Sequence, residues 1–120
     1  MFKVHADTTR NRLYITLEGF FSIEESKACG DEIVANIRKL KSGYDCITDI
    51  TSFKPGTQEV AKDIERVQAH FKTTGARRGV RVVGGNASSS MQFARLAKQA
   101  GFESCNVATL AEAEKLLDSE

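Results

Sequence analysis

The sequence predicts an α/β fold, in which a mixed, mainly parallel β-sheet begins with an antiparallel hairpin and is covered by four helices, in the order β-β-α-β-α-β-α-β-α. Two observations predict it. Apolar and polar residues alternate with a period of two near the N-terminus, which is typical of paired strands with one buried face. Further along, short apolar runs alternate with segments that carry helix caps and helical apolar stripes, which is typical of parallel strands joined by right-handed crossovers.

The hairpin is predicted over residues 2–18. Apolar residues occupy every second position over 2–6, and the alternation resumes over 13–17 after the polar stretch 8–12. A period of two on both sides of a polar turn favours two antiparallel strands. Gly19 ends the pattern.

The first helix is predicted from its N-terminal cap. Ser22 and Glu25 have the spacing of a capping box, in which the hydroxyl and the carboxylate each satisfy a backbone N–H of the first turn. We expect the helix to run to about Lys41 and to end at residues 42–43, with Gly30 allowing a close approach to the sheet. Its apolar face consists of Ile23, Ser26, Gly30, Ile33, Ile37 and Leu40.

The central segment predicts a strand over residues 44–49, a loop over 50–56, and a helix that begins near Thr57 and ends at Gly75. Its helical stripe consists of Val60, Ile64, Val67 and Phe71. In an open α/β sheet, ligands bind at the carboxyl ends of the strands. The junction between this strand and the following helix is therefore the expected working edge.

The β-branched run 80–83 predicts a buried strand whose rim is charged by Arg77, Arg78 and Arg81. After the Gly- and Ser-rich stretch 84–90, Ser89 and Gln92 have capping-box spacing, so we expect the next helix to begin there.

The C-terminal part predicts one more strand and one more helix. Gly101 ends the preceding helix, and the last strand covers about 103–107. Thr109 is the expected cap of the final helix, whose inward residues are Leu110, Ala113 and Leu117.

Composition predicts one domain, residues 1–120, with 41% apolar and 28% charged residues, values that are ordinary for a globular protein. The net charge is +1, so we expect no nucleic-acid partner, since non-specific binding needs a basic excess.

Cys29, Cys46 and Cys105 have no metal-ligand spacing, so we expect free thiols and no metal. The absence of a long apolar run or a signal-peptide pattern predicts no membrane span and a cytoplasmic location.

The element order and the strand-to-helix junction resemble the STAS domain, in particular the divergent SpoIIAA-like proteins related to anti-sigma factor antagonists. Asp49-Ile50-Thr51 is similar to the Asp-Leu-Ser motif of that family at the end of the third strand. The segment 54–58 stands where the family carries its phosphorylation site, without the acidic residue or the paired serines. The resemblance implies a regulatory protein partner, such as an anti-sigma factor-like kinase, and places the phosphoswitch in doubt.

The strand-to-helix junction supplies the first candidate site. The expected partner-binding residues are Asp49, Thr51, Ser52, Phe53, Lys54 and Thr57. Asp49 has no second carboxylate or His to form a catalytic pair, and an Asx-turn that accepts from Thr51 or Ser52 is the simpler interpretation. Thr57 and Ser52 are candidate phosphorylation sites, although Thr57 is also an ordinary N-cap. Phe53 either caps the core or projects into a partner.

The Gly- and Ser-rich stretch is the second candidate. Glycines that allow a close backbone approach and a serine-rich helix start favour anion binding, and the residues concerned are Gly84, Gly85, Asn86, Ser88 and Ser89. A tight turn with a helix cap is the alternative. Likewise, Arg77, Arg78, Arg81 and Lys72 form either a small basic patch or a solvated strand start. Cys46 is expected to be a small core residue rather than a nucleophile.

These candidates favour a non-enzymatic regulatory module that binds a protein partner at residues 49–58, with no cofactor. The alternative is a small-molecule or lipid-binding domain that uses the sheet end near Phe53 and residues 84–90. An enzyme ranks last, because no nucleophile, base and orienting group stand together in the sequence. The exposed edge strand of the hairpin also allows a homodimer.

Overall fold

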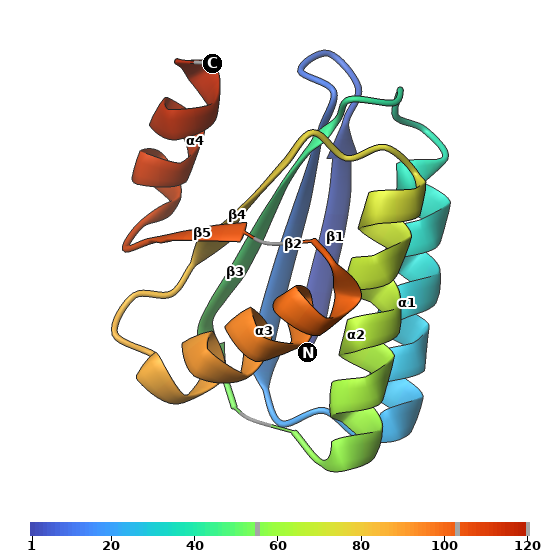
Figure 1. The fold of residues 1–120 in the computed structure, drawn as a ribbon, viewed down its shortest axis with the longest axis vertical. Helices are drawn as coiled ribbons and strands as arrows, with labels where there is room; N and C mark the ends of the chain where they lie inside the picture. Colours follow the sequence, from blue (N-terminus) through green and yellow to red (C-terminus); the bar gives the residue numbers. More distant parts are fainter. Residues whose placement is uncertain (55, 103, 120) are drawn as a thin grey trace.

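Five strands form one sheet whose spatial order, β1-β2-β3-β4-β5, is also the order of the strands in the chain (Figure 1). The structure is a computed structural model that describes residues 1–54, 56–102 and 104–119. Its elements are β1 Phe2–Asp7, β2 Arg12–Gly19, α1 Ile23–Ile37, β3 Asp45–Phe53, α2 Gln58–Thr73, β4 Arg78–Val82, α3 Ala87–Ala100, β5 Ser104–Val107 and α4 Leu110–Asp118. The predicted fold class and element order are confirmed.

The sheet is mixed, as predicted. The pair β1–β2 is antiparallel, while β2–β3, β3–β4 and β4–β5 are parallel. Each crossover moves the chain by one strand in the same direction. Right-handed crossovers that all move in one direction place their helices on one face of the sheet. Helices α1, α2 and α3 share one face, and α4 covers the other (Figure 1).

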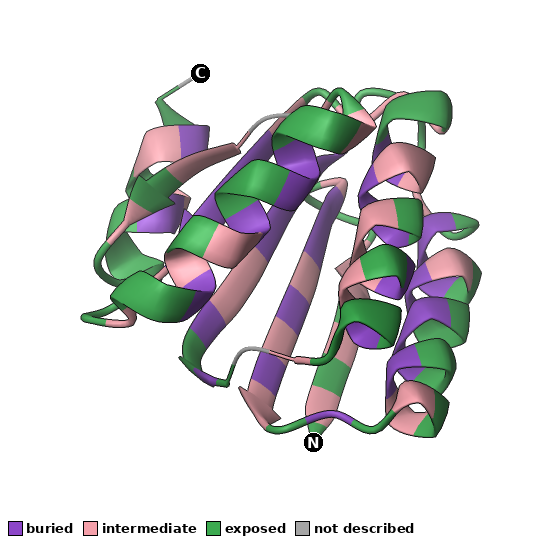
Figure 2. Ribbon diagram, turned by 60° about the horizontal axis from the view of Figure 1, so that its bottom comes forward, coloured by how far each residue is buried: buried purple, intermediate pink, exposed green. Residues whose placement is uncertain are grey.

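The main core lies between the sheet and α1, α2 and α3. The buried residues of these helices face the strands, and the exposed residues face outward (Figure 2). The cluster consists of Leu13, Ile15, Leu17, Phe21, Cys29, Ile33, Ile37, Tyr44, Cys46, Ile50, Phe53, Val60, Val67, Phe71 and Phe93. These residues include most of the apolar positions that the period-two and helical stripes predict.

A second, smaller core lies under α4. Ala113 and Leu117 pack on strand residues Ile47, Val80 and Val82, so alternate positions of β3 and β4 serve the two faces of the sheet. The prediction that Leu110 points inward is wrong, because Leu110 is the first residue of α4 and is 44% exposed.

Two polar contacts also hold α4. The hydroxyl of Tyr14 donates to Glu114 Oε1 over 2.8 Å, and Arg12 Nη2 donates to Asp118 Oδ1 over 3.0 Å.

The largest difference from the predicted elements is in β3, which continues through residues 50–53 instead of ending at Asp49. Its register with β2 shifts between Thr16 and Glu18, so β3 carries one extra residue there before pairing resumes at Glu18–Ser52 and Gly19–Phe53. Such a β-bulge breaks the period of two. For this reason the segment has the sequence pattern of a loop although it is a paired strand.

Two further expectations need correction. Helix α1 ends at Ile37 rather than near Lys41, because i→i+3 bonds from Lys39 and Leu40 form turns after it. Gly30 allows a close approach to α2 rather than to the sheet, since a Cβ on Gly30 would lie 3.3 Å from Val67 Cγ2. Glu103, the predicted start of the last strand, lies outside the described residues. None of the helices described here is both long and apolar enough to cross a bilayer.

Candidate functional site

The two stretches that the sequence singles out meet at the carboxyl edge of the parallel strands. Residues at the end of β3 and residues that follow β4 line one wide-open hollow there, which consists of Thr51, Ser52, Phe53, Lys54, Gly85 and Asn86. We call these six residues the strand-end hollow. Because β3 and β4 are parallel neighbours, their carboxyl ends lie at the same edge of the sheet.

Asn86 joins the two sides of the strand-end hollow. Its side-chain amide nitrogen donates to the carbonyl oxygens of Ile50 over 2.8 Å and of Phe53 over 2.6 Å. Its side-chain oxygen accepts from the backbone N–H of Ser89 over 3.3 Å, which makes Asn86 the N-cap of α3. The expectation that Ser89 caps this helix is therefore wrong, and the cap lies three residues earlier.

Ser89 is also engaged inside the protein. Its side chain is 0% exposed, and its hydroxyl donates to the carbonyl oxygen of Phe53 over 2.8 Å. The side-chain donors of both Asn86 and Ser89 are thus bonded to carbonyl oxygens of β3, and anion binding at these two residues stays a prediction. Gly84, Gly85 and Ser88 are exposed, and for them an anion site stays a prediction.

Asp49 forms the predicted Asx-turn. Its Oδ1 accepts from the backbone N–H of Thr51 over 2.9 Å, next to the bulge of β3. The carboxylate therefore stabilises the local backbone.

Thr57 is the N-cap of α2, as expected, because its hydroxyl oxygen accepts from the backbone N–H of Val60 over 3.3 Å. Both Thr57 and Ser52 are exposed. Phosphorylation at either residue stays a prediction. Pro55, between them, lies outside the described residues.

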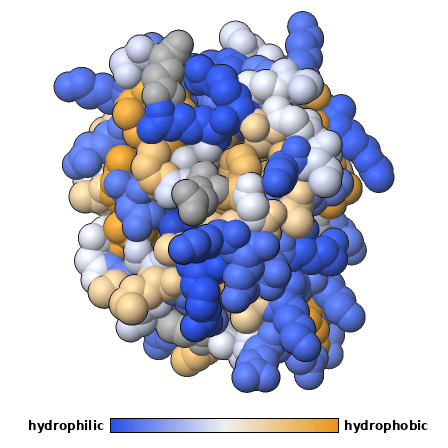
Figure 3. Space-filling model, in the orientation of Figure 1, coloured by the Kyte–Doolittle hydropathy of each residue, from blue (hydrophilic) through white to orange (hydrophobic). Residues whose placement is uncertain are grey.

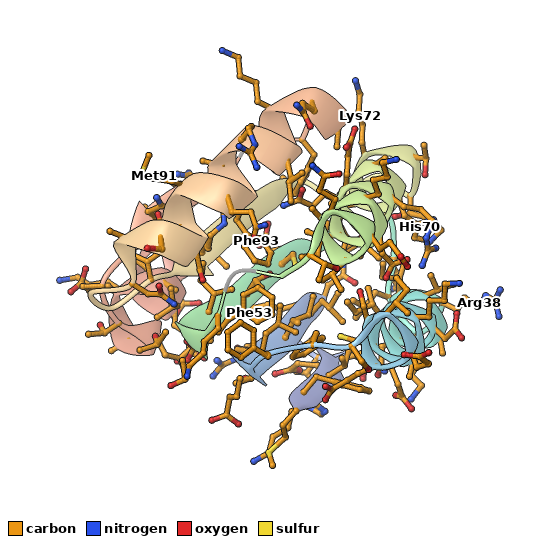
Figure 4. The ribbon with its side chains drawn as sticks, turned by 90° about the horizontal axis from the view of Figure 1, so that it is seen from below. Arg38, Phe53, His70, Lys72, Met91 and Phe93 are labelled. Carbon is orange, nitrogen blue, oxygen red and sulfur yellow. The ribbon has the colours of Figure 1, made fainter. Side chains whose placement is uncertain are left out.

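Phe53 belongs to the core. It is 2% exposed and makes edge-on ring contacts to Phe21 at 5.2 Å and Phe93 at 5.5 Å between centroids. Seen from below, Phe53 and Phe93 point into the layer between the sheet and the helices, whereas Met91 points away from α3 (Figure 4). Of the two open alternatives, the structure favours the one in which Phe53 caps the core, so its ring is not offered to a partner.

The exposed aromatic ring beside the strand-end hollow belongs instead to Phe20, which sequence reasoning missed. Phe20 is 68% exposed, and the Lys54 ammonium lies 5.2 Å from its ring centroid, within cation–π distance. The signal that could have revealed it is its place directly after Gly19, where the alternation of β2 stops and Phe21 returns to the core.

The arginines of the third candidate group do not form a shared patch. Arg77 makes two hydrogen bonds to the Asp45 carboxylate, over 2.9 and 2.7 Å, and Arg78 Nη2 contacts Cys105 Sγ at 3.1 Å. Arg81 is only 3% exposed, which corrects the expectation that it charges the strand rim.

Cys46 is a buried core residue, as predicted, and burial raises the pKa of its thiol to about 12.

In comparisons with known proteins, no family model and no curated protein sequence matches the chain. Within residues 1–54, 56–102 and 104–119, no three His, Cys, Asp or Glu side chains gather as they would around a metal ion.

Proposed function

We propose that the protein is a non-enzymatic regulatory module that binds a partner protein through the strand-end hollow and the neighbouring ring of Phe20. The observation that carries this proposal is the convergence of the two predicted segments, residues 51–54 and 85–86, in one open hollow. The resemblance to anti-sigma factor antagonists, through Asp49-Ile50-Thr51, supports the same edge.

The geometry of this edge suits recognition of a folded partner. The backbone is held in place by Asn86, Ser89 and Asp49, so little conformational entropy would be lost on binding. Exposed hydroxyl groups of Thr51 and Ser52 and the cation of Lys54 surround it. An exposed aromatic ring within a polar surrounding is the usual composition of an interface centre.

A small-molecule or lipid-binding function remains the alternative proposal. The strand-end hollow is wide open and is lined by both polar and apolar surface, whereas ligand pockets are usually concave and mainly apolar. An apolar cavity lies elsewhere, between the sheet and the helices. Pairing of two copies through the edge strand β1 also stays a proposal.

The test is affinity capture from the lysate of the native host with wild-type protein and single variants. Phe20→Ser and Lys54→Glu should each lose a discrete protein that the wild type retains. Two matched controls lie outside this edge, namely Met91→Ser, which changes a residue 74% exposed, and Lys115→Glu, which changes an exposed lysine on α4. Equal retention by all five proteins would count against the proposal.

A further inference from the structure

A cavity of about 60 Å³ lies between the sheet and helices α1, α2 and α3. It exists because the strands below it carry small side chains, namely Cys46, Thr48, Gly79 and Ser104, on the face that these helices cover. At about 30 Å³ for each water molecule, such a volume holds about two of them. Hydrophobic side chains reach the surface near the middle of the face formed by α2 and α3, surrounded by hydrophilic ones (Figure 3).

Arg81 is a buried cation in the wall of this cavity. It is 3% exposed, it donates from Nη1 to Asn106 Oδ1 over 3.0 Å, and its guanidinium carbon lies 5.6 Å from the Phe93 ring centroid. Among the residues that the structure describes, no carboxylate forms an ion pair with it. Burial lowers the pKa of Arg81. An amide and a ring compensate a buried charge only in part.

The buried carboxylate that also lines the cavity is already neutralised. Asp63 accepts from the Ser26 hydroxyl over 2.6 Å and from Arg66 Nε and Nη2 over 3.1 and 3.0 Å. This network joins α1 to α2. Asp63 therefore has its own cation and hydroxyl donor, and it makes no ion pair with Arg81.

Gln68 supplies a second, independent observation. It is 6% exposed, it lines the cavity, and its Oε1 has no hydrogen-bond partner within the part of the chain that the structure describes. A buried amide oxygen without a partner destabilises the folded state, because it has lost its hydrogen bond to water. Because the oxygen and nitrogen of such an amide exchange by a rotation, Gln68 can either donate to a ligand or accept from it.

We propose that this cavity binds a small monocarboxylic acid of about two or three carbon atoms, with its carboxylate on Arg81, a polar contact to Gln68 and its methyl or ethyl group beside Phe71, Phe93 and Phe102. The carboxylate supplies the counter-ion that Arg81 lacks, through the planar two-pronged contact that a guanidinium favours. The three aromatic residues all line the cavity. Phe53 borders both this cavity and the strand-end hollow, but Arg81 and Gln68 line the cavity alone, so either proposal can fail without the other.

The test uses the full chain with acetate and propionate, which suit a cavity of about 60 Å³, each paired with its neutral amide. Binding is followed by isothermal titration and by the rise in Tm. At least one carboxylate should bind saturably and at least about tenfold more tightly than its amide, because a hydrogen bond to a charged group is the stronger one.

Variants locate the contact. Arg81→Met should bind that carboxylate at least about tenfold more weakly, with an unliganded Tm no lower than that of the wild type, because an uncompensated buried charge is removed. Gln68→Leu, of similar volume, should also weaken binding, and it keeps the test open should Arg81→Met fail to fold. Arg95→Gln, an exposed arginine on α3, should leave binding unchanged. The proposal is overturned if no carboxylate binds the wild type more tightly than its amide, or if Arg81→Met and Gln68→Leu keep wild-type affinity.

Discussion

The side-chain amide of Asn86 donates a hydrogen bond to the carbonyl oxygen of Phe53 over 2.6 Å, and this contact ties the start of α3 to the end of β3. The same carbonyl oxygen accepts from the Ser89 hydroxyl. Two segments that are distant in the sequence are thereby fixed at one edge of the sheet. The shape of the strand-end hollow depends on this arrangement.

Asn86→Ala should destabilise the protein by about 2–3 kcal/mol, because it removes an N-cap and the donor to two β3 carbonyl groups. Ser89→Ala should cost about 1 kcal/mol, since Asn86 still serves the Phe53 carbonyl. Urea unfolding measures both values. Ser88→Ala is the control, because Ser88 is exposed, and its effect should stay within about 0.5 kcal/mol. A control effect as large as that of Asn86→Ala would refute this account of the cap.

Phe53 and Phe20 should differ strongly in their contribution to stability. Phe53→Ala removes a ring that is 2% exposed and should cost about 3–5 kcal/mol of unfolding free energy. Phe20→Ala changes a ring that is 68% exposed and should alter stability by no more than about 0.5 kcal/mol. Thermal unfolding of the two variants checks this. The burial argument is wrong if Phe20→Ala is the more damaging substitution.

At position 57, the aspartate variant should be more stable than the alanine variant. Thr57→Ala loses the acceptor for the Val60 N–H and should cost about 1 kcal/mol. Thr57→Asp keeps an acceptor and places a negative charge at the helix N-terminus, where the helix dipole favours it, so its stability should equal or exceed that of the wild type. Denaturant midpoints decide the order, and an Asp variant weaker than the Ala variant would exclude a tolerated phosphate here.

Stability should fall at alkaline pH. Burial raises the pKa of Cys46 from 9.0 to about 12, and burial likewise raises the pKa of Cys29 to about 12. Because the unfolded chain releases these protons first, the contribution of the two thiols to stability is fully present below pH 9.0 and is lost as the pH rises toward about 12. Urea midpoints over this range should decline, and Cys46→Ala should show a shallower decline. A midpoint independent of pH would contradict the assignment.

The sequence predicts the class, order and direction of the elements because buried faces impose a period of two on strands and regular apolar stripes on helices. N-caps whose hydrogen bonds form within one helical turn can also be predicted from the sequence, and Ser22, Thr57 and Thr109 cap their helices as expected. Asn86 could also have been predicted as a cap, since asparagine is a favoured N-cap residue. The capping-box spacing of Ser89 and Gln92, three residues later, favoured a different start for the helix.

The remaining features depend on contacts between distant residues. The bulge of β3 removes the period that would have marked residues 50–53 as a strand. The burial of Arg81 comes from Phe93 on a following helix and Asn106 on a neighbouring strand, which no local pattern contains. The cavity likewise arises from small residues on several strands that become neighbours only in the folded sheet.

The central claim, that the strand-end hollow docks a partner protein, is tested most directly by site-specific photo-crosslinking in the native host. A photoreactive amino acid in place of Ser52, which lines the strand-end hollow, should give one discrete crosslinked species. The same amino acid in place of Thr9, in the turn at the opposite end of β2, should not give it. No species from position 52, or the same species from position 9, would contradict the claim.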